Sequence, residues 1–180
     1  MGATLQFPDM ADAMRQRFLG AMSRGVSMVN VVTTDGVAGR FGATVSAMVS
    51  LSADMSPPTL LVSLNRSSAT AVAIAQNGVF CVNVLRESQQ DVADCFAGRV
   101  RVKDKFDCAS WSRGMTGGWR LTDAVASFDC RVLKSELVGT HYLIIGSTEW
   151  VSADPDGRAL LYGDRAYCAA VSLPERSTAF

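Results

Sequence analysis

The 180-residue sequence is poor in the side chains that many catalytic and metal sites require. It has one histidine, His141, and its five cysteines, at positions 81, 95, 108, 130 and 168, form no C-x-x-C motif. A structural zinc site is therefore not expected. A scattered, odd set of cysteines without a visible secretory signal is typical of reduced thiols in a cytoplasmic protein. We expect free cysteines and a cytoplasmic location.

The chain also lacks an excess of charge of either sign. Its 17 basic residues balance 17 acidic ones, so the sequence has no electrostatic signature of a nucleic-acid-binding protein. The uncharged segment 67–85 is long enough to suggest a membrane span. Its polar residues and the Asn77-Gly78 pair instead favour a helix that ends there and a following strand. We expect neither nucleic acid nor a membrane as a partner.

The common nucleotide and hydrolase motifs are missing as well. There is no G-x-G-x-x-G after a strand, no G-x-x-x-x-G-K-[ST] and no G-x-S-x-G. The sequence thus gives no signal for a Rossmann site, a P-loop or a nucleophile elbow.

Small and hydroxylated side chains are concentrated between residues 39 and 70 instead. Four of them, Thr44, Ser46, Ser50 and Ser52, recur at even spacing, so a single strand would place them on one face. A face with little bulk lets a flat ligand approach the backbone. This pattern is also typical of any half-exposed strand.

A helix start follows this stretch. Pro57-Pro58 should turn the chain into a buried strand at 59–64, and Asn65-Arg66-Ser67-Ser68 then precedes an alanine-rich helical run. Free amides, hydroxyls and an arginine at a helix start suit a phosphate group. The whole stretch predicts a site for a planar, phosphorylated cofactor. The alternative is an ordinary N-cap beside a solvated arginine.

The remaining periodicity predicts a mainly β protein. We expect helices at 9–24, up to Asn77, and at 88–97, the last with a capping box from Ser88 to Asp91. Further strands are expected at 26–33, 79–85, 124–133, 140–151 and 159–162. An antiparallel β-barrel in one domain spanning 1–180, with tails at 1–8 and 170–180, accommodates them. The irregular segment 99–118 is expected to form a lid or an edge of the ligand site.

His141 allows two interpretations. In a strand it shares a face with Leu143 and Ile145, which favours a half-buried structural histidine. Gly139-Thr140 just before it favours the start of a strand at the barrel rim, where ligands enter. The residues alone leave both open.

The ordered motifs resemble those of the short flavin reductase family, the FMN-binding split-barrel reductases that supply reduced flavin to two-component monooxygenases. The resemblance covers about residues 14–168. Its motifs are FLGAMS (18–23), VNVVTT (29–34), GATVSA (42–47), SLS (50–52), PP (57–58), SLNRS (63–67), FCVNVL (80–85), FAG (96–98), DKF (104–106), GTH (139–141), LY (161–162) and RAY (165–167).

The resemblance implies an antiparallel split barrel that works as a homodimer, and it implies roles for particular residues. The isoalloxazine would lie along Thr44, Val45, Ser46 and Ala47. The ribityl chain and phosphate would be held by Ser50, Leu51, Asn65, Arg66 and Ser67, and the Ala97-Gly98 turn would close over the flavin. The nicotinamide nucleotide would be placed by His141, Arg165 and Tyr167. The family commonly has Gly-Asp-His where this chain has Gly139-Thr140-His141, so a carboxylate that could orient the histidine is missing.

The expected function is an NAD(P)H:flavin oxidoreductase that reduces FMN or FAD, uses NADH or NADPH, and releases reduced flavin to a separate oxygenase. Hydride transfer needs the two rings stacked, and the cofactor carries the reaction, so neither an acid–base pair nor a metal is required. Two alternatives are a flavoprotein of the same fold with a fixed FMN and another substrate, and a non-catalytic flavin-binding dimer.

Overall fold

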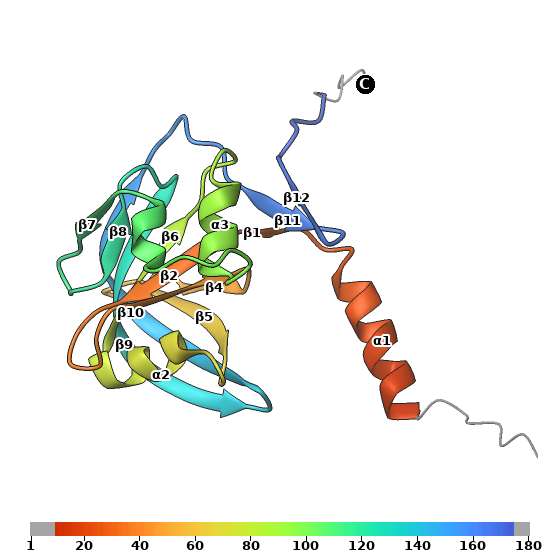
Figure 1. Ribbon diagram of the computed structural model, residues 1–180, viewed down its shortest axis with the longest axis horizontal. Coiled ribbons are helices and arrows are strands. Elements are labelled where there is room, and N and C mark those ends of the chain that lie inside the picture. The colour runs from red at the N-terminus through yellow and green to blue at the C-terminus, as the bar shows by residue number, and fades with distance from the viewer. Residues whose placement is uncertain (1–9, 175–180) are drawn as a thin grey trace, which may run out of the picture.

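The computed structural model describes residues 10–174 and contains three α-helices there (Figure 1). They are α1 (Met10–Met22), α2 (Ala69–Asn77) and α3 (Gln90–Phe96), and a 3₁₀ helix, η1, spans Lys105–Cys108. Residues 1–9, which include the expected N-terminal tail at 1–8, lie outside the described part. Residues 175–180 of the expected C-terminal tail lie outside it too.

Twelve strands form three antiparallel sheets in the described part. The main sheet has the order β3-β2-β6-β9-β10-β5-β4. Its strands are β2 (Asn30–Thr34), β3 (Phe41–Val45), β4 (Met48–Ser52), β5 (Thr59–Asn65), β6 (Val79–Val84), β9 (Ala126–Val138) and β10 (His141–Ala153). A second sheet joins β1 (Ser27–Met28), β11 (Leu161–Gly163) and β12 (Ala166–Cys168), and β7 (Trp111–Arg113) pairs with β8 (Trp119–Leu121).

Two hydrophobic cores lie on opposite faces of the central strands. Val31 of β2 packs with α3 and η1, whereas the next residue, Val32, packs with α2 and the inner faces of β5 and β10. Every residue of β2 and β6 is buried, because both faces of these strands are covered. This explains why the two segments, apart from Asn30 and Asn83, read as continuous apolar or β-branched runs rather than as alternating ones.

The expected fold class, a mainly antiparallel β protein of the split-barrel type, is confirmed. The sheet bends strongly: a Cβ at Gly146 in β10 would lie 2.5 Å from the ring of Phe80 in β6, so only glycine permits this approach. The edge strands β3 and β4 are not neighbours in the hydrogen-bonded order of the described sheet. They are joined instead by the short turn between Val45 and Met48.

Two local expectations are wrong. The hydroxyl residues from Thr44 to Ser52 do not share one strand, because the chain turns at Ser46-Ala47 and continues at the opposite edge of the sheet. The expected capping box at Ser88 is absent, and α3 begins after Gln89. The side chain of Gln89 instead accepts a hydrogen bond from the amide of Arg86.

The expectation that all cysteines are free is also wrong. Cys95, in the last turn of α3, forms a disulfide with Cys108 at the end of η1. The two residues are 13 positions apart, and only the return of the chain from α3 to η1 brings them together. No short spacing motif marks such a pair. Cys81, Cys130 and Cys168 are free.

Candidate functional site

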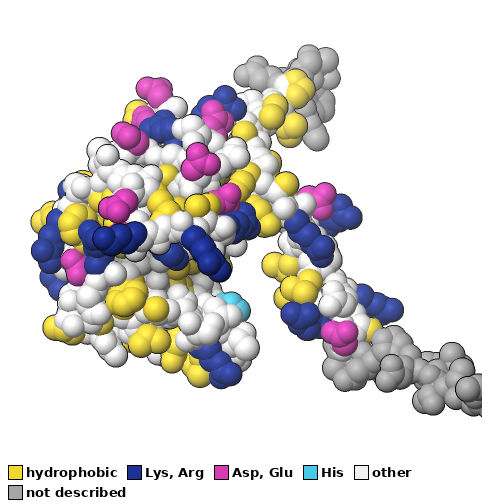
Figure 2. Space-filling model, viewed as in Figure 1, with side chains coloured by type: hydrophobic (Ala, Val, Ile, Leu, Met, Phe, Trp, Pro, Cys, Tyr) yellow, Lys and Arg dark blue, Asp and Glu magenta, His cyan; other side chains and the backbone are white. Residues whose placement is uncertain are grey.

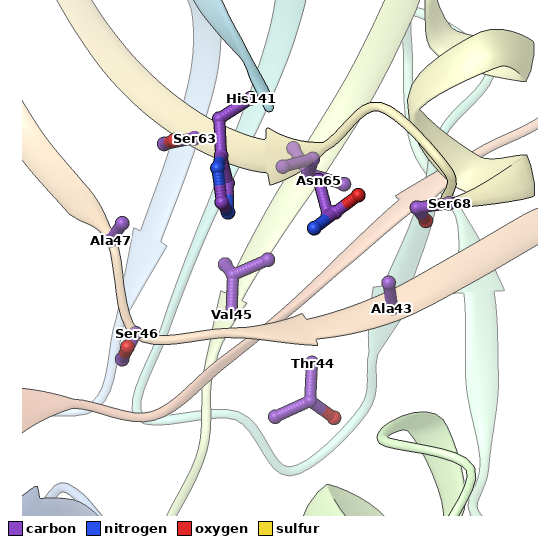
Figure 3. A pocket seen from close by; sticks show the side chains of 10 residues that line it. Ala43, Thr44, Val45, Ser46, Ala47, Ser63, Asn65, Ser68 and His141 are labelled. Carbon is purple, nitrogen blue, oxygen red and sulfur yellow. The ribbon is translucent and has the colours of Figure 1, made fainter. Parts of the chain in front are cut away.

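A cavity of about 360 Å³ opens along the edge strand β3. Its lining comes from the β3–β4 turn, from β5 and the start of α2, and from the first residue of β10. These residues are Ala43, Thr44, Val45, Ser46, Ala47, Ser63, Leu64, Asn65, Ser68 and His141 (Figure 3). The structure therefore brings together the 44–47 stretch, Asn65 and His141, which the sequence had singled out separately.

Alternation along β3 decides which side chains form the floor of this cavity. Figure 3 shows Ala43 and Val45 pointing toward Asn65 and His141, while Thr44 points the other way. The hydroxyl of Thr44 donates a hydrogen bond of 2.7 Å to the carbonyl of Ala93 in α3. The floor thus carries only small side chains. Because β3 is an edge strand, peptide groups on its free side remain available to a ligand.

The opposite wall is formed by paired ends of β5 and β10. Asn65 and His141 lie directly opposite each other in the register of the two strands. His141 is exposed and its Nδ1 lies 3.0 Å from the hydroxyl of Thr140, so the rim interpretation of this histidine is confirmed. Thr140 supplies a hydrogen-bonding partner for the ring at the position where the carboxylate is missing.

The turn after β5 is ordered by its own side chains. Asn65 Oδ1 accepts hydrogen bonds from the amide of Ser67 at 2.9 Å and from its hydroxyl at 2.8 Å. The amide of Arg66 bonds to the carbonyl of Thr140, which joins this turn to the β9–β10 hairpin. Ser68 is the N-cap of α2 and lines the cavity, although its side chain makes no capping bond. The first amides of α2 therefore begin at the cavity wall, where an anion would be favoured.

A second cavity of about 530 Å³ continues the first along β3 and shares Ala43, Thr44 and Ser68 with it. The α3–η1 segment closes its far side. The further lining residues are Arg40, Phe41, Gly42, Ala69, Thr70, Phe96, Ala97, Lys103, Asp104, Lys105 and Phe106. Of the irregular segment 99–118, which is expected to form a lid or an edge of the ligand site, residues 103–106 line this second cavity. We call the two cavities together the β3 groove.

Tyr167 and Arg165 lie outside the β3 groove. Tyr167 lines a hollow of about 180 Å³ on the other side of Thr44 and Val45, together with Ala97. Arg165 lines a separate hollow beside α1. Within one chain, the structure does not bring these two residues to His141.

The Tyr167 hydroxyl belongs to a small polar network behind the groove. It donates a hydrogen bond of 2.7 Å to Asp94 Oδ1, which also accepts one of 2.8 Å from Arg99. These bonds, that from Tyr167 foremost, hold the pKa of Asp94 below its usual value. Desolvation and the neighbouring carboxylate raise the pKa of Tyr167 to about 12, so its hydroxyl stays protonated at physiological pH. The network ties α3 and the Ala97-Gly98 turn to β12.

The other sequence-predicted residues have different positions. Ser50 lines a small apolar hollow with Met48 and Pro58, and Leu51 is exposed on β4. Gly98 follows Ala97 with a φ of +75°, the left-handed conformation that glycine favours. Sequence reasoning missed Ala43 and Ser63 as lining residues, whereas Ser68 belongs to the helix start that it had singled out for a phosphate. The alternation that selects Val45 could have found Ala43.

The described residues contain neither a candidate metal site nor a candidate membrane-spanning helix. Between residues 10 and 174, no group of three or more His, Cys, Asp or Glu side chains could hold a metal ion. No helix in the same part of the chain is long and apolar enough to cross a membrane.

The protein is thus a small antiparallel β protein with an open groove along an edge strand of its main sheet. A family model described as a flavin reductase like domain matches residues 22–170, and the chain belongs to this family. The "FMN reductase (NADH) RutF" of Methylorubrum extorquens strain DM4 is 43% identical over 159 residues, 88% of this chain and 77% of that protein. The protein of the same name from Pantoea ananatis is 40% identical and covers 93% of this chain and 90% of its own.

Solved structures agree with this assignment. BorF, the flavin reductase component of a bacterial two-component tryptophan halogenase, is 29% identical with a TM-score of 0.78, and the match covers 90% of this chain and 99% of BorF. A homolog of nitrilotriacetate monooxygenase component B from Mycobacterium thermoresistibile is 27% identical with a TM-score of 0.79, covering 93% and 96% of the two chains.

Proposed function

We propose that this protein is an NADH-dependent flavin reductase that uses FMN. The observation that carries the proposal is the β3 groove, whose floor of small side chains faces His141 and whose end meets the start of α2. A flat ring fits along such a floor, and the amides at the helix start suit a phosphate. Membership of the flavin reductase like family and the relatives named FMN reductase (NADH) support it.

The residues proposed to bind the flavin divide into two groups. The backbone of Thr44 to Ala47 would hold the isoalloxazine ring, since Ala43 and Val45 add little bulk on that side. The phosphate and ribityl chain would be bound by the turn after β5, whose members are Asn65, Arg66 and Ser67. Ser50 and Leu51 complete the set that the family resemblance implies, with Ala97 and Gly98 closing over the ring from behind Thr44.

Bound flavin supplies the hydride-accepting ring, so the chain itself has only to orient and to exclude water. His141, held by Thr140, stands across the floor from Val45 and would position the nicotinamide nucleotide over the groove. Arg165 and Tyr167 line two other hollows, so they would contact a nicotinamide nucleotide only if it extended beyond the β3 groove into those hollows.

We further propose that the reduced flavin leaves and serves a separate oxygenase. The groove is open, and the structural neighbour BorF is the reductase component of a two-component system. FAD and NADPH are the alternative flavin and donor. A fixed FMN with another substrate, or flavin binding without turnover, remain the competing functions.

The deciding experiment is NADH oxidation by extensively dialysed protein with and without added FMN. Turnover that needs added flavin is the expected result. A protein that retains flavin through dialysis and gains nothing from added FMN is a fixed-flavin protein, and one that binds FMN without oxidising NADH is a binding module. Arg66→Ala should weaken FMN far more than riboflavin, which lacks the phosphate.

We also propose that the protein is a homodimer. Met14, Phe18 and Met22 recur every fourth residue on α1 and are 65%, 61% and 62% exposed, and α1 stands away from the body (Figures 1 and 2). No other described residue covers this stripe, which fits an apolar surface of a second copy. Phe18→Glu should convert a dimer into a monomer in light scattering, whereas Arg17→Glu should not. A wild-type protein that is monomeric at micromolar concentration would contradict the proposal.

A further inference from the structure

The disulfide between Cys95 and Cys108 spans the segment that closes the far side of the β3 groove. Cys95 belongs to α3 and Cys108 to η1. Between them lie six residues that line the groove: Phe96, Ala97, Lys103, Asp104, Lys105 and Phe106. The bond therefore closes a covalent loop, which we call the 95–108 loop, directly behind the proposed flavin site.

The two ends of this loop are packed against the strand that forms the groove floor. A Cβ at Gly42 of β3 would lie 2.5 Å from the Phe96 ring, so Phe96 rests directly on that strand. Phe96 and Phe106 meet edge to face with centroids 5.3 Å apart. Lys105 donates a hydrogen bond of 3.0 Å to the carbonyl of Phe96. The disulfide thus fixes both ends of the loop beside the aromatic pair that supports β3.

The middle of the loop has much less to hold it. Residues 97–103 are all exposed and form no helix or strand. Arg99 forms an ion pair with Asp94 and donates a hydrogen bond of 3.1 Å to the Tyr167 hydroxyl, and Asp104, just after this part, forms an ion pair with Arg40. Partly exposed ion pairs of this kind contribute little to order. The disulfide is the covalent restraint on the 95–108 loop, and the exposed residues between its ends are held by few other contacts.

We propose that the Cys95–Cys108 disulfide is a reversible thiol switch that sets the flavin affinity of the β3 groove. The inference rests on the proposed flavin reductase function. A disulfide restricts the conformations of the loop that it closes, and a loop already in its binding conformation costs less entropy when ligand arrives. The oxidised protein binds flavin tightly, and the reduced protein binds it less tightly.

The chemistry of the switch is thiol–disulfide exchange. A thiolate of a dithiol attacks the sulfur of Cys108, the more exposed partner, and releases Cys95 as a thiolate, which takes up a proton. The second thiol of the reductant then displaces Cys108 and closes its own disulfide, so two electrons pass to the protein. In the reverse direction, one hydrogen peroxide oxidises the two thiols to the disulfide and yields two water molecules.

The remaining cysteines provide internal controls. Cys81 and Cys130 are buried in the core, and burial is the main cause that raises the pKa of both thiols, that of Cys130 to about 12. Such thiols are poor nucleophiles. Cys168, on β12, is partly exposed and free, so Cys168→Ser is the matched control for a cysteine variant outside the loop.

The bond is checked first by tryptic mapping of peroxide-treated full-length protein. Cleavage after Arg86, Arg99, Lys105 and Arg113 places Cys95 in peptide 87–99 and Cys108 in peptide 106–113. These two peptides should appear as one linked mass that separates after dithiothreitol. Unlinked peptides in the peroxide-treated protein would overturn the proposal.

The affinity for FMN is then measured by titration of the oxidised and the dithiothreitol-reduced protein. Reduction should weaken FMN binding about three- to tenfold, the effect of releasing one or two restrained groups. The double variant Cys95→Ser, Cys108→Ser should bind FMN like the reduced wild type with or without reductant, whereas Cys168→Ser should respond like the wild type. FMN affinity that is equal in both redox states would overturn the switch and leave the reductase function intact. Failure of both states to bind FMN would overturn both.

Discussion

The two sides of β3 differ sharply in how they are held. Toward the groove, the strand presents Ala43 and Val45 to open space and to the exposed His141. Toward α3, Gly42 is in direct contact with Phe96, and the Thr44 hydroxyl bonds to the carbonyl of Ala93. One side of the strand is therefore supported by α3, which we call the packed side, and the other side, toward His141, is left free, which we call the open side.

This difference indicates how a small protein keeps a flat site ready for a ligand. An edge strand with one open side would be mobile if nothing supported it. The aromatic cluster of Phe96, Phe106, Trp111 and Trp119 provides that support from behind, with neighbouring ring centroids 5.2 to 6.3 Å apart. We expect changes on the packed side to alter stability, and changes on the open side to alter ligand binding alone.

The largest effect is expected for Gly42→Val. Its Cβ would come within 2.5 Å of Phe96 Cε1, so either the ring or the strand must move. Overpacking of a well-filled core costs about 1–3 kcal/mol of the free energy of unfolding, measurable by urea denaturation. The control is Gly20→Ala in α1, where a Cβ meets nothing within 4 Å. Equal stability of Gly42→Val and the wild type would show that the packed side is not rigid.

On the open side, His141→Ala should change binding without changing stability. A hydrogen bond to a charged group contributes about 1.5 kcal/mol, so the KM for NADH should rise about tenfold. The Kd for FMN and the urea midpoint should stay close to the wild-type values, because His141 is exposed. Thr140→Val, which removes the partner of Nδ1, should give a smaller rise in KM. An equal loss of FMN affinity would place His141 on the flavin rather than on the nicotinamide.

Thr44 contributes to both sides of β3, because its side chain bonds to α3 whereas its backbone is proposed to hold the ring. Thr44→Val removes the bond to Ala93 at nearly constant volume and should lower the free energy of unfolding by about 1 kcal/mol. Thr44→Ser keeps the hydroxyl and should be less affected. FMN affinity should change little in either variant, since the side chain points away from Asn65 and His141 and only the backbone of Thr44 is proposed to hold the ring. Loss of FMN binding without loss of stability would mean that the hydroxyl contacts the ligand.

Some features on both sides of β3 could be predicted from the sequence, and others could not. The strands β2 and β6, the end of α2 at Gly78 and the rim position of His141 follow from local patterns, because burial and turn preferences are local properties. The turn at Ser46-Ala47 does not. Alternation of hydroxyl residues continues across it, and only the bending of the sheet decides that β4 pairs with β5.

Contacts between distant segments likewise could not be predicted from the sequence. Three such features depend on how the chain returns to the sheet after α3 and η1. They are the Cys95–Cys108 disulfide, the contact of Phe96 with Gly42, and the separation of Tyr167 from His141. Nothing in the spacing of these residues encodes that return. Residues 44–47, Asn65 and His141 were found because each lies in a recognisable local motif, and the fold then joins them in one cavity.

The smallest expected effect concerns pH and the network behind the groove. The bonds from Tyr167 and Arg99 lower the pKa of Asp94 in the folded protein. A lowered folded-state pKa stabilises the fold above the unfolded value, about 3.9 for aspartate, and this stabilisation is lost as the pH falls through the folded value. The Tm of the wild type should therefore exceed that of Asp94→Asn at neutral pH, and the difference should shrink below about pH 4. Asp91→Asn, at an exposed position of the same helix, controls for the loss of one negative charge. A difference that stays constant down to low pH would mean that Asp94 acts through packing, and the support behind β3 would then not depend on its charge.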